Sequence, residues 1–571
     1  MNRIAVRSSQ LSQHLLLLIF LLLVLPAVSI AQTVIRGPYL QSPTPNSIIV
    51  KWRTDIATDS AVGYNVLNGT PQSTTDATST TEHEVTISSL SADTLYNYTV
   101  GTTGGVLAGG DLNTNGDGEH FFTTSPATGT EKDTRIWVIG DSGTADINAE
   151  TVREGYKTFT GLRGTDVWLM LGDNAYNIGS DTEYQSAVFE IYPQLLRQIP
   201  LWSAVGNHDG IDIAFNPPGA YPQIFEFPAA GEAGGVASGS EFYYSFDYGS
   251  IHFISLDSTL VANASIGSAM MTWLANDLAA NTQDWTIAFW HHPEYSKGSH
   301  DSDVEAPLIF IRENVVPVLE AHGVDLMLSG HSHSYERSYL LNGHHGQSGT
   351  LVPAMILDGG DGSESGDGAY LKPGPAGTPN EGAVHVVVGS SGKIEVEGDL
   401  DHPAMHVSMF ELGSLVVDVS GNRLDGTFID ETGAIQDEFT IIKSPPMVVN
   451  IDVQPWDADN AVLPASSEII GVAIQGMSTG SGDPIDFDAS QVDIATVTFA
   501  IGEAPNVAVP WMMDFDGDTL EDLLLGFQTM DTGIVCNDTD VEVFGETFGG
   551  EEFTGTDSIA TLDCIDEGCH P

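Results

Sequence analysis

The sequence predicts a multidomain chain with an N-terminal β-sandwich, a layered α/β domain and a C-terminal acidic β domain. Short alternating strands separated by turns rich in Thr, Ser and Asn occupy residues 34–125, as in small sandwiches. Strand-length apolar runs then alternate with stretches that can hold helices, as in α/β domains. Beyond Lys443 the chain contains no Lys or Arg, yet alternation continues, which favours a folded domain over an acidic tail.

Residues 1–31 have the pattern of a secretory signal peptide. Arg3 and Arg7 precede an apolar stretch from Leu15 to Leu25, and small residues follow up to Ala31. This stretch is short for a membrane span, although an uncleaved anchor is the alternative. The sequence therefore predicts a secreted or periplasmic protein with no membrane insertion after signal cleavage.

Five apolar runs of strand length each end in residues that can bind metals. Because the carboxyl ends of strands in an α/β sheet meet at one edge, these ends can converge. Together the five ends supply hard oxygen ligands and imidazoles. These are more ligands than a single catalytic metal uses, since such a metal keeps one coordination position open. They suit two metals that share a bridging carboxylate. The five ends are Gly140-Asp141, Gly172-Asp173-Asn174-Ala175-Tyr176, Gly206-Asn207-His208-Asp209, His291-His292 and Ser329-Gly330-His331-Ser332-His333.

The order of these motifs resembles that of purple acid phosphatases in the calcineurin-like metallophosphoesterase superfamily. Residues 134–443 would then form the catalytic domain, a four-layer αββα arrangement of two mixed sheets flanked by helices. Residues 34–125 are similar to the fibronectin type III-like domain of the plant-type enzymes, with a familiar opening at Arg36 to Gln41.

The resemblance assigns the metal ligands residue by residue. The first metal would be held by Asp141, Asp173, Tyr176 and His333, and the second by Asp173, Asn207, His291 and His331, so that Asp173 bridges. The phenolate of Tyr176 favours Fe(III), and the second metal in the family is Fe, Zn or Mn.

The resemblance also implies the reaction: hydrolysis of phosphate monoesters, with small phosphorylated substrates attacked by a metal-bound hydroxide. His208 resembles the histidine that protonates the leaving group, and His300 lies where related enzymes carry another histidine beside the substrate. Other histidines are interpreted as structural or as ordinary surface residues: His252 and His292 as structural, and His344, His345, His402 and His406 as loop or surface residues.

Residues 447–571 are predicted to form the acidic β module. Carboxylates alternate around Gly517 in a pattern that resembles a calcium-binding loop, and calcium prefers six to eight oxygen ligands. The predicted calcium ligands are Asp514, Asp516, Asp518 and Asp522. All three cysteines of the chain also lie here, so one disulfide at most forms within it; Cys536 with Cys564 is the favoured pair, and Cys569 is left over.

The formal net charge of −60 limits the partners of this chain, because so acidic a surface repels nucleic acids and anionic membranes. Two alternatives to a monoesterase remain. One is a phosphodiesterase or nucleotide phosphatase of the same superfamily. The other is a calcium-dependent surface protein whose phosphoesterase domain is inactive, a reading that the complete ligand set opposes.

Overall fold

The computed structural model describes residues 32–210, 219–259, 264–443, 446–457, 459–464, 466–480, 483–549 and 551–562. The predicted signal peptide at residues 1–31 lies outside this range. The described residues divide into two compact units, one up to Tyr370 together with Ala376–Ile441, the other Leu371–Pro375 together with the chain from Ile442 onward. Within the described part of the chain, no helix combines the length and the apolar character that a membrane span requires.

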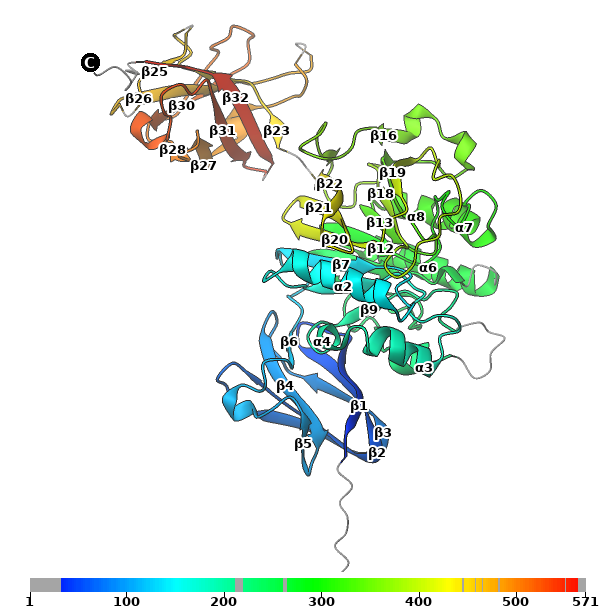
Figure 1. The fold of residues 1–571 in the computed structure, drawn as a ribbon. Helices are drawn as coiled ribbons and strands as arrows, with labels where there is room; N and C mark the ends of the chain where they lie inside the picture. Colours follow the sequence, from blue (N-terminus) through cyan, green and yellow to red (C-terminus); the bar gives the residue numbers. More distant parts are fainter. Residues whose placement is uncertain are drawn as a thin grey trace, which may run out of the picture. The chain divides into compact units, whose positions relative to one another are not determined.

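The N-terminal region is one hydrogen-bonded sheet of six strands around its own core (Figure 1). Strand β2 is long enough to pair with β1 and β3 at one end and with β3 and β4 at the other, and its pairing register shifts between Arg53 and Ser60. The fibronectin type III-like resemblance and the domain boundaries stay predictions. The strands are β1 (Val34–Gln41), β2 (Ser47–Val66), β3 (Gln72–Ser88), β4 (Leu95–Thr102), β5 (Gly105–Ala108) and β6 (Phe121–Thr123), with a 3-10 turn η1 (Leu112–Thr114).

Two seven-stranded mixed sheets form the middle of the chain. The first has the order β17 (Tyr370–Lys372), β22 (Ile435–Lys443), β21 (Arg423–Asp430), β20 (Gly413–Ser420), β7 (Thr134–Ile139), β8 (Val167–Met170) and β9 (Leu201–Ser203). The second has the order β10 (Tyr244–Tyr248), β11 (Ile251–Ser255), β12 (Trp285–Phe289), β13 (Leu326–Ser329), β18 (Val384–Val388), β14 (Tyr335–Ser338) and β19 (Met405–Met409). The strands β7, β8 and β9 are parallel, as are β11, β12, β13 and β18.

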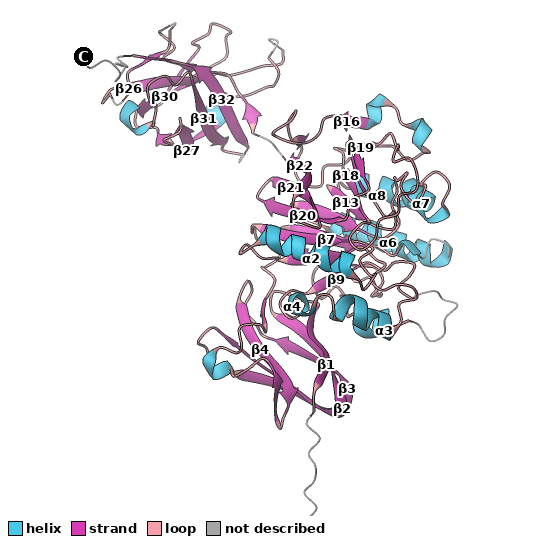
Figure 2. Ribbon diagram, viewed as in Figure 1, coloured by secondary structure: helices cyan, strands magenta, loops and turns pink. Residues whose placement is uncertain are grey.

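Helices cover the sheets, whereas the regions before and after consist mainly of strands (Figure 2). The helical segments are α2 (Ile147–Thr160), α3 (Asp181–Tyr184), η2 (Gln185–Phe189), α4 (Pro193–Leu196), α5 (Tyr221–Ile224), α6 (Ala264–Ala280), α7 (Ala306–Phe310), η4 (Ile311–Val315) and α8 (Val316–Glu320). The remaining short elements are β15 (Leu340–Leu341), η5 (Ser348–Thr350), η6 (Pro353–Met355) and β16 (Ile356–Asp358).

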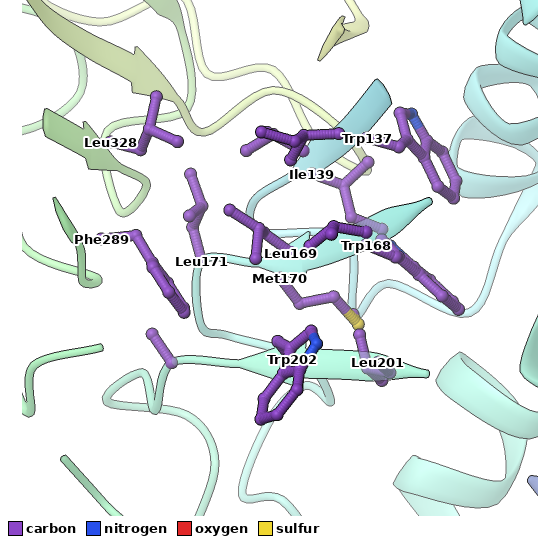
Figure 3. Packing of buried hydrophobic residues seen from close by; sticks show 14 of the residues in the cluster. Trp137, Ile139, Trp168, Leu169, Met170, Leu171, Leu201, Trp202, Phe289 and Leu328 are labelled. Atoms are coloured by element: carbon purple, nitrogen blue, oxygen red, sulfur yellow. The ribbon is translucent and has the colours of Figure 1, made fainter. Parts of the chain in front are cut away.

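Buried apolar side chains fill the space between and outside the two sheets. Leu169 and Ile139 from the first sheet share one core with Phe289 and Leu328 from the second (Figure 3). On the first sheet Trp137 stacks on Tyr156 of α2 with ring centroids 4.3 Å apart. A second core joins β11 to β13 with α6, α7, η4 and α8. These layers confirm the predicted fold class.

The described residues of the C-terminal unit form two small sheets around a separate apolar core, and Ala461–Val462 pairs with Ala560–Thr561 in a further two-stranded sheet. One sheet has the order β23-β32-β31-β27-β28 and the other β24-β26-β30-β29. Cys536 is disulfide-bonded, and its predicted partner Cys564, like Cys569, lies outside the described residues. The elements are β23 (Met447–Val448), β24 (Ile451–Val453), β25 (Ala461–Val462), β26 (Ile469–Ile474), η7 (Ala489–Gln491), β27 (Val492–Phe499), β28 (Ala504–Pro505), β29 (Trp511–Met513), β30 (Asp522–Gln528), η8 (Thr529–Asp531), β31 (Asp540–Thr547), β32 (Glu552–Ser558) and β33 (Ala560–Thr561).

His252 on β11 is a buried structural residue, as the sequence predicts. Its Nδ1 lies 2.7 Å from Asp247 Oδ1 and its Nε2 lies 2.9 Å from Asp277 Oδ2. Burial alone lowers the pKa of His252, but hydrogen bonds and charge from the two carboxylates outweigh burial and raise it to about 9. The imidazolium therefore stabilises the fold.

We expect this stabilisation to be complete below about pH 6.5 and to disappear as the pH rises through about 9, because the folded pKa lies above the unfolded one. Its size is on the order of 2–3 kcal/mol by linkage. Urea unfolding between pH 6 and pH 10 in excess chelator would measure it. The variant His252→Gln should lose this pH dependence, and an unchanged slope in the variant would contradict the assignment.

Candidate metal centre

Five strand ends from both sheets deliver the predicted metal ligands to one place. Asp141 follows β7, Asp173 and Tyr176 follow β8, and Asn207 follows β9, all in the first sheet. The second sheet supplies His291 after β12 and, after β13, His331 and His333. The site therefore lies where the carboxyl ends of parallel strands in the two sheets meet, the edge at which α/β sheets bind ligands.

Glycines before the ligands allow the strand ends to approach one another. A Cβ atom on Gly206 would lie 2.2 Å from the backbone nitrogen of Asp173, and one on Gly330 would lie 2.5 Å from Asp141 Oδ2. Three ligand residues adopt positive φ angles that non-glycine residues rarely use: Asp141 at 54°, Asp173 at 51° and His331 at 65°. Such backbone strain is typical of functional sites whose surroundings hold it in place.

The first group of ligands surrounds the carboxylate of Asp141, which is fully buried. The hydroxyl of Tyr176 lies 3.0 Å from Asp141 Oδ1 and 3.2 Å from His333 Nε2. His333 Nε2 is 3.4 Å from the same carboxylate oxygen. Burial, followed by the charges of Asp141 and Asp173, raises the pKa of the Tyr176 phenol well above its usual range. The phenol therefore ionises only when a strong cation binds beside it.

The second group contains Asp173, Asn207, His291 and His331. His291 Nε2 lies 3.0 Å from Asn207 Oδ1, 3.4 Å from Asp173 Oδ1 and 3.2 Å from His331 Nδ1. Asp173 also lies in a tight group with Asp141 and His291, whose ligand atoms are all within 4.8 Å of one another. Asp173 thus stands between the two groups, as a bridging ligand must.

The second group has the chemistry of a cation site. His291 Nδ1 lies 2.9 Å from the carbonyl oxygen of Leu171, to which it can donate, so Nε2 presents its lone pair to the group. His331 Nε2 lies 3.7 Å from the carboxylate of Glu305. The Nδ1 atom of His331 can therefore present a second lone pair to the same group. Burial lowers the pKa of His291, but the charges of Asp173 and Asp141 raise it to about 9. Converging lone pairs and carboxylates of this kind fit two metal ions.

The two predicted catalytic histidines border the ligand groups. His208 Nδ1 lies 2.7 Å from the carbonyl oxygen of Asn177, and its Nε2 is 4.0 Å from Asp173 Oδ2. Its side chain is 39% exposed, so a substrate can reach it. The ring of His300 packs on that of His331 with centroids 3.7 Å apart.

Sequence reasoning missed Glu305, which joins His300 to the predicted metal ligand His331. Its carboxylate lies 3.0 Å from His300 Nδ1 and 3.7 Å from His331 Nε2. Burial raises the pKa of Glu305, but the hydrogen bond with His331 and the contacts of His300 outweigh burial and lower it to about 2. A carboxylate on the far nitrogen of a metal-binding histidine orients the ring and raises its basicity. Glu305 stands outside the five motifs, although its position five residues after His300 is a weak sequence signal.

Asp209 is the second residue whose role the motifs did not indicate. Oδ1 accepts hydrogen bonds from the Asn174 backbone at 2.9 Å and the Tyr184 hydroxyl at 2.6 Å, and Oδ2 accepts one from the Gly206 backbone at 2.8 Å. Burial and the charge of Asp173 raise its pKa to about 7. Asp209 therefore ties the loop after β8 to the loop after β9.

His292 and the calcium loop complete the predicted sites. His292 is buried, with Nδ1 2.8 Å from Ser258 Oγ, as expected of a structural residue. In the C-terminal unit the carboxylates of Asp514, Asp516 and Asp522 converge within 4.8 Å, and Asp518 is outside this group. Calcium binding at this loop stays a prediction.

Comparison with known proteins places the fold and site in a class. A family model of calcineurin-like phosphoesterases matches residues 134–335, the range that contains all seven predicted ligands. This part of the chain is a calcineurin-like phosphoesterase domain. Within that class, the curated relatives that the chain resembles include purple acid phosphatases, and its fold matches that of a purple acid phosphatase of known structure.

Two curated relatives and one solved structure illustrate the similarity. The chain is 28% identical to purple acid phosphatase 15 of Arabidopsis thaliana over 306 residues, 49% of this chain and 53% of that one. It is 25% identical to acid phosphatase type 7 of Mus musculus over 327 residues, 54% of this chain and 64% of that one. Its fold matches purple acid phosphatase PPD1 of Lupinus luteus with a TM-score of 0.54 at 18% identity, covering 72% of this chain and 75% of that one. The chain spans about half to two thirds of the length of these curated relatives.

Replacing Glu305 by Gln should weaken metal retention by roughly 10–100-fold, the usual effect of losing a carboxylate partner of a metal-binding histidine. Metal content after dialysis against graded chelator would measure the change. The matched control is Glu313→Gln, which removes the same charge from an exposed position on η4. Equal retention in the two variants would contradict the orienting role of Glu305.

Proposed function

We propose that this protein is an exported, dinuclear metal-dependent acid phosphatase that hydrolyses phosphate monoesters. The observation that supports the proposal best is the pair of ligand groups that meet at Asp173, one containing the phenol of Tyr176 and the other two histidines. The first metal would be Fe(III), held by Asp141, Asp173, Tyr176 and His333. The second would be Fe, Zn or Mn, held by Asp173, Asn207, His291 and His331.

The metals explain how so acidic a protein can bind an anionic substrate. When bound, they supply Lewis acidity, and they lower the pKa of water at the site. A trivalent and a divalent cation together outweigh the two carboxylates and the phenolate that hold them. The site can therefore be locally positive although the net charge of the chain is −60, and phosphoryl transfer depends mainly on such positioning and charge neutralisation.

His208 would protonate the leaving oxygen. Its Nδ1 proton is directed at the carbonyl of Asn177, so the ring orientation is fixed and a second proton can be carried only on Nε2. Nε2 is on the side of Asp173, where the substrate phosphate would bind. An imidazolium in this position can transfer the Nε2 proton to a departing alkoxide. His300 would contact the substrate from the side of His331.

The second candidate is a phosphodiesterase or nucleotide phosphatase with the same metal centre. A phosphate diester lacks one of the anionic oxygens of a monoester, so two cations favour the monoester more strongly. We expect a higher kcat/KM for a phenyl monoester than for the diester with the same leaving group. Steady-state rates for both esters would decide, and a preference for the diester would reject the monoesterase proposal.

Metal analysis with a visible spectrum tests the identity of the first metal. We expect iron and a tyrosinate-to-Fe(III) absorption band in the purified protein. Because the band requires the phenolate, Tyr176→Phe should abolish it while iron binding through the other ligands persists. Absence of iron, or an unchanged band in the variant, would overturn the assignment. A metal-loaded protein that hydrolyses no phosphate ester would instead favour a calcium-dependent surface protein with an inactive domain.

A further inference from the structure

His300 is carried by a loop that closes on itself. This segment, the His300 loop, comprises residues 294–302. The backbone N–H of Ser302 donates to the carbonyl of Ser296 at 3.1 Å, and the backbone N–H of Ser296 donates to Ser302 Oγ at 3.2 Å. Lys297 forms ion pairs with Asp301 and, at 2.9 Å, with Asp303. The loop therefore has a narrow neck and a tip at Ser299 and His300.

The tip of the His300 loop contacts the histidines that follow β13. Ser299 Oγ accepts a hydrogen bond from the backbone N–H of His333 at 2.9 Å. The ring of His300 packs on His331, and its Nδ1 contacts Glu305. Small movements of the neck would therefore displace His300 relative to the metal ligands.

A single guanidinium group spans the neck. Arg312 on η4 is fully buried, and its Nη1 donates to the carbonyl of Glu294 at 3.3 Å and also to the carbonyl of Ser302. These two carbonyls are the first and last of the His300 loop. Arg312 thus fixes the distance between the two ends of the loop.

The remaining polar atoms around Arg312 are poorly paired. The Nε and Nη2 atoms of Arg312 and Oε2 of Glu294 are buried without a hydrogen-bond partner within the protein. Burial of a charge is costly unless the charge is paired and fully hydrogen-bonded. An apolar residue of similar size would serve the stability of this core at least as well. The presence of Arg312 is therefore better explained by its hydrogen bonds to the two ends of the His300 loop than by a contribution to the stability of the fold.

Histidines form the other wall of the neck. Tyr295 packs against His344, His385 and His402 with ring centroids 5.3, 4.9 and 5.3 Å apart. His385 Nδ1 forms a short contact with Glu294 Oε1. The sequence predicts that His344 and His402 are loop or surface residues; both lie in loops, but both are buried. A surface position is wrong for them because long-range packing of loops against Tyr295 excludes solvent.

We propose that Arg312 is a positioning residue that holds the neck of the His300 loop and thereby sets His300 beside the metal ligands. The inference rests on the proposed function, because His300 is expected to contact the phosphate substrate. The hydrogen bonds that Arg312 donates go to the backbone of the His300 loop and not to a predicted metal ligand. Its effect must therefore pass through His300.

A double-mutant cycle tests this dependence. The variants are Arg312→Met, His300→Ala and the double variant, compared by calorimetric affinity for inorganic phosphate and by kcat/KM for a phenyl monoester at equal metal content. The effects of residues that act as a unit are not additive. Arg312→Met should therefore lower both the phosphate affinity and kcat/KM when His300 is present. In the His300→Ala background, the same substitution should lower them little further. Additive losses would overturn the proposal, as would loss of metal from Arg312→Met alone.

Amide hydrogen exchange gives a readout that requires neither metal nor turnover. In metal-free protein, Arg312→Met should accelerate exchange in the His300 loop by about tenfold or more, with β12 and β13 unchanged, because only the local closure is weakened. Arg312→Lys keeps the buried charge and should show a smaller effect if Arg312→Met proves unstable. The control Glu313→Gln should exchange as the wild type does.

The two measurements separate the possible failures. Unchanged exchange in the loop, or exchange that rises across the whole domain, would reject the role of Arg312. Faster loop exchange in a protein that neither binds inorganic phosphate nor hydrolyses esters would instead reject the proposed function while the local role of Arg312 holds.

Discussion

The close approach of strand ends from two sheets is the constraint on which the metal centre depends. Gly206 and Gly330 occupy positions where any Cβ would collide with Asp173 or Asp141. The short spacing that these glycines permit brings lone pairs and carboxylates to within about hydrogen-bond distance of one another. Asp209 and Glu305 then hold the loops that carry those groups, so the arrangement is fixed by the surrounding fold and not by the cation alone.

Electrostatic repulsion within this arrangement indicates its chemistry. Asp141 and Asp173 are both buried, and within the described part of the chain their side chains are paired with histidines and a tyrosine, not with a lysine or an arginine. The raised pKa values of His291 and Tyr176 show that these two side chains favour their protonated forms, and a metal ion can take the place of their protons. The asymmetry between a phenol on one side and two imidazoles on the other is therefore built into the protein.

The fold class and the convergence of the five motifs could be predicted because each depends on local sequence. Apolar runs define the strands, and a Gly with a polar residue marks the end of each. Glu305 and Arg312 could not be found in this way, since their roles depend on contacts made across the His300 loop. Burial of His344 and His402 likewise results from distant loops, and Asp518 stands outside the carboxylate cluster although its sequence position fits the predicted pattern.

The division of the ligands between two sheets has a consequence for assembly. Asp141, Asp173, Tyr176 and Asn207 come from one sheet, whereas His291, His331 and His333 come from the other. Neither ligand group is complete on a single sheet, so neither half of the domain can capture its metal alone. If the proposed metals bind, they would be loaded after the two sheets have docked, and each ion would link one sheet to the other.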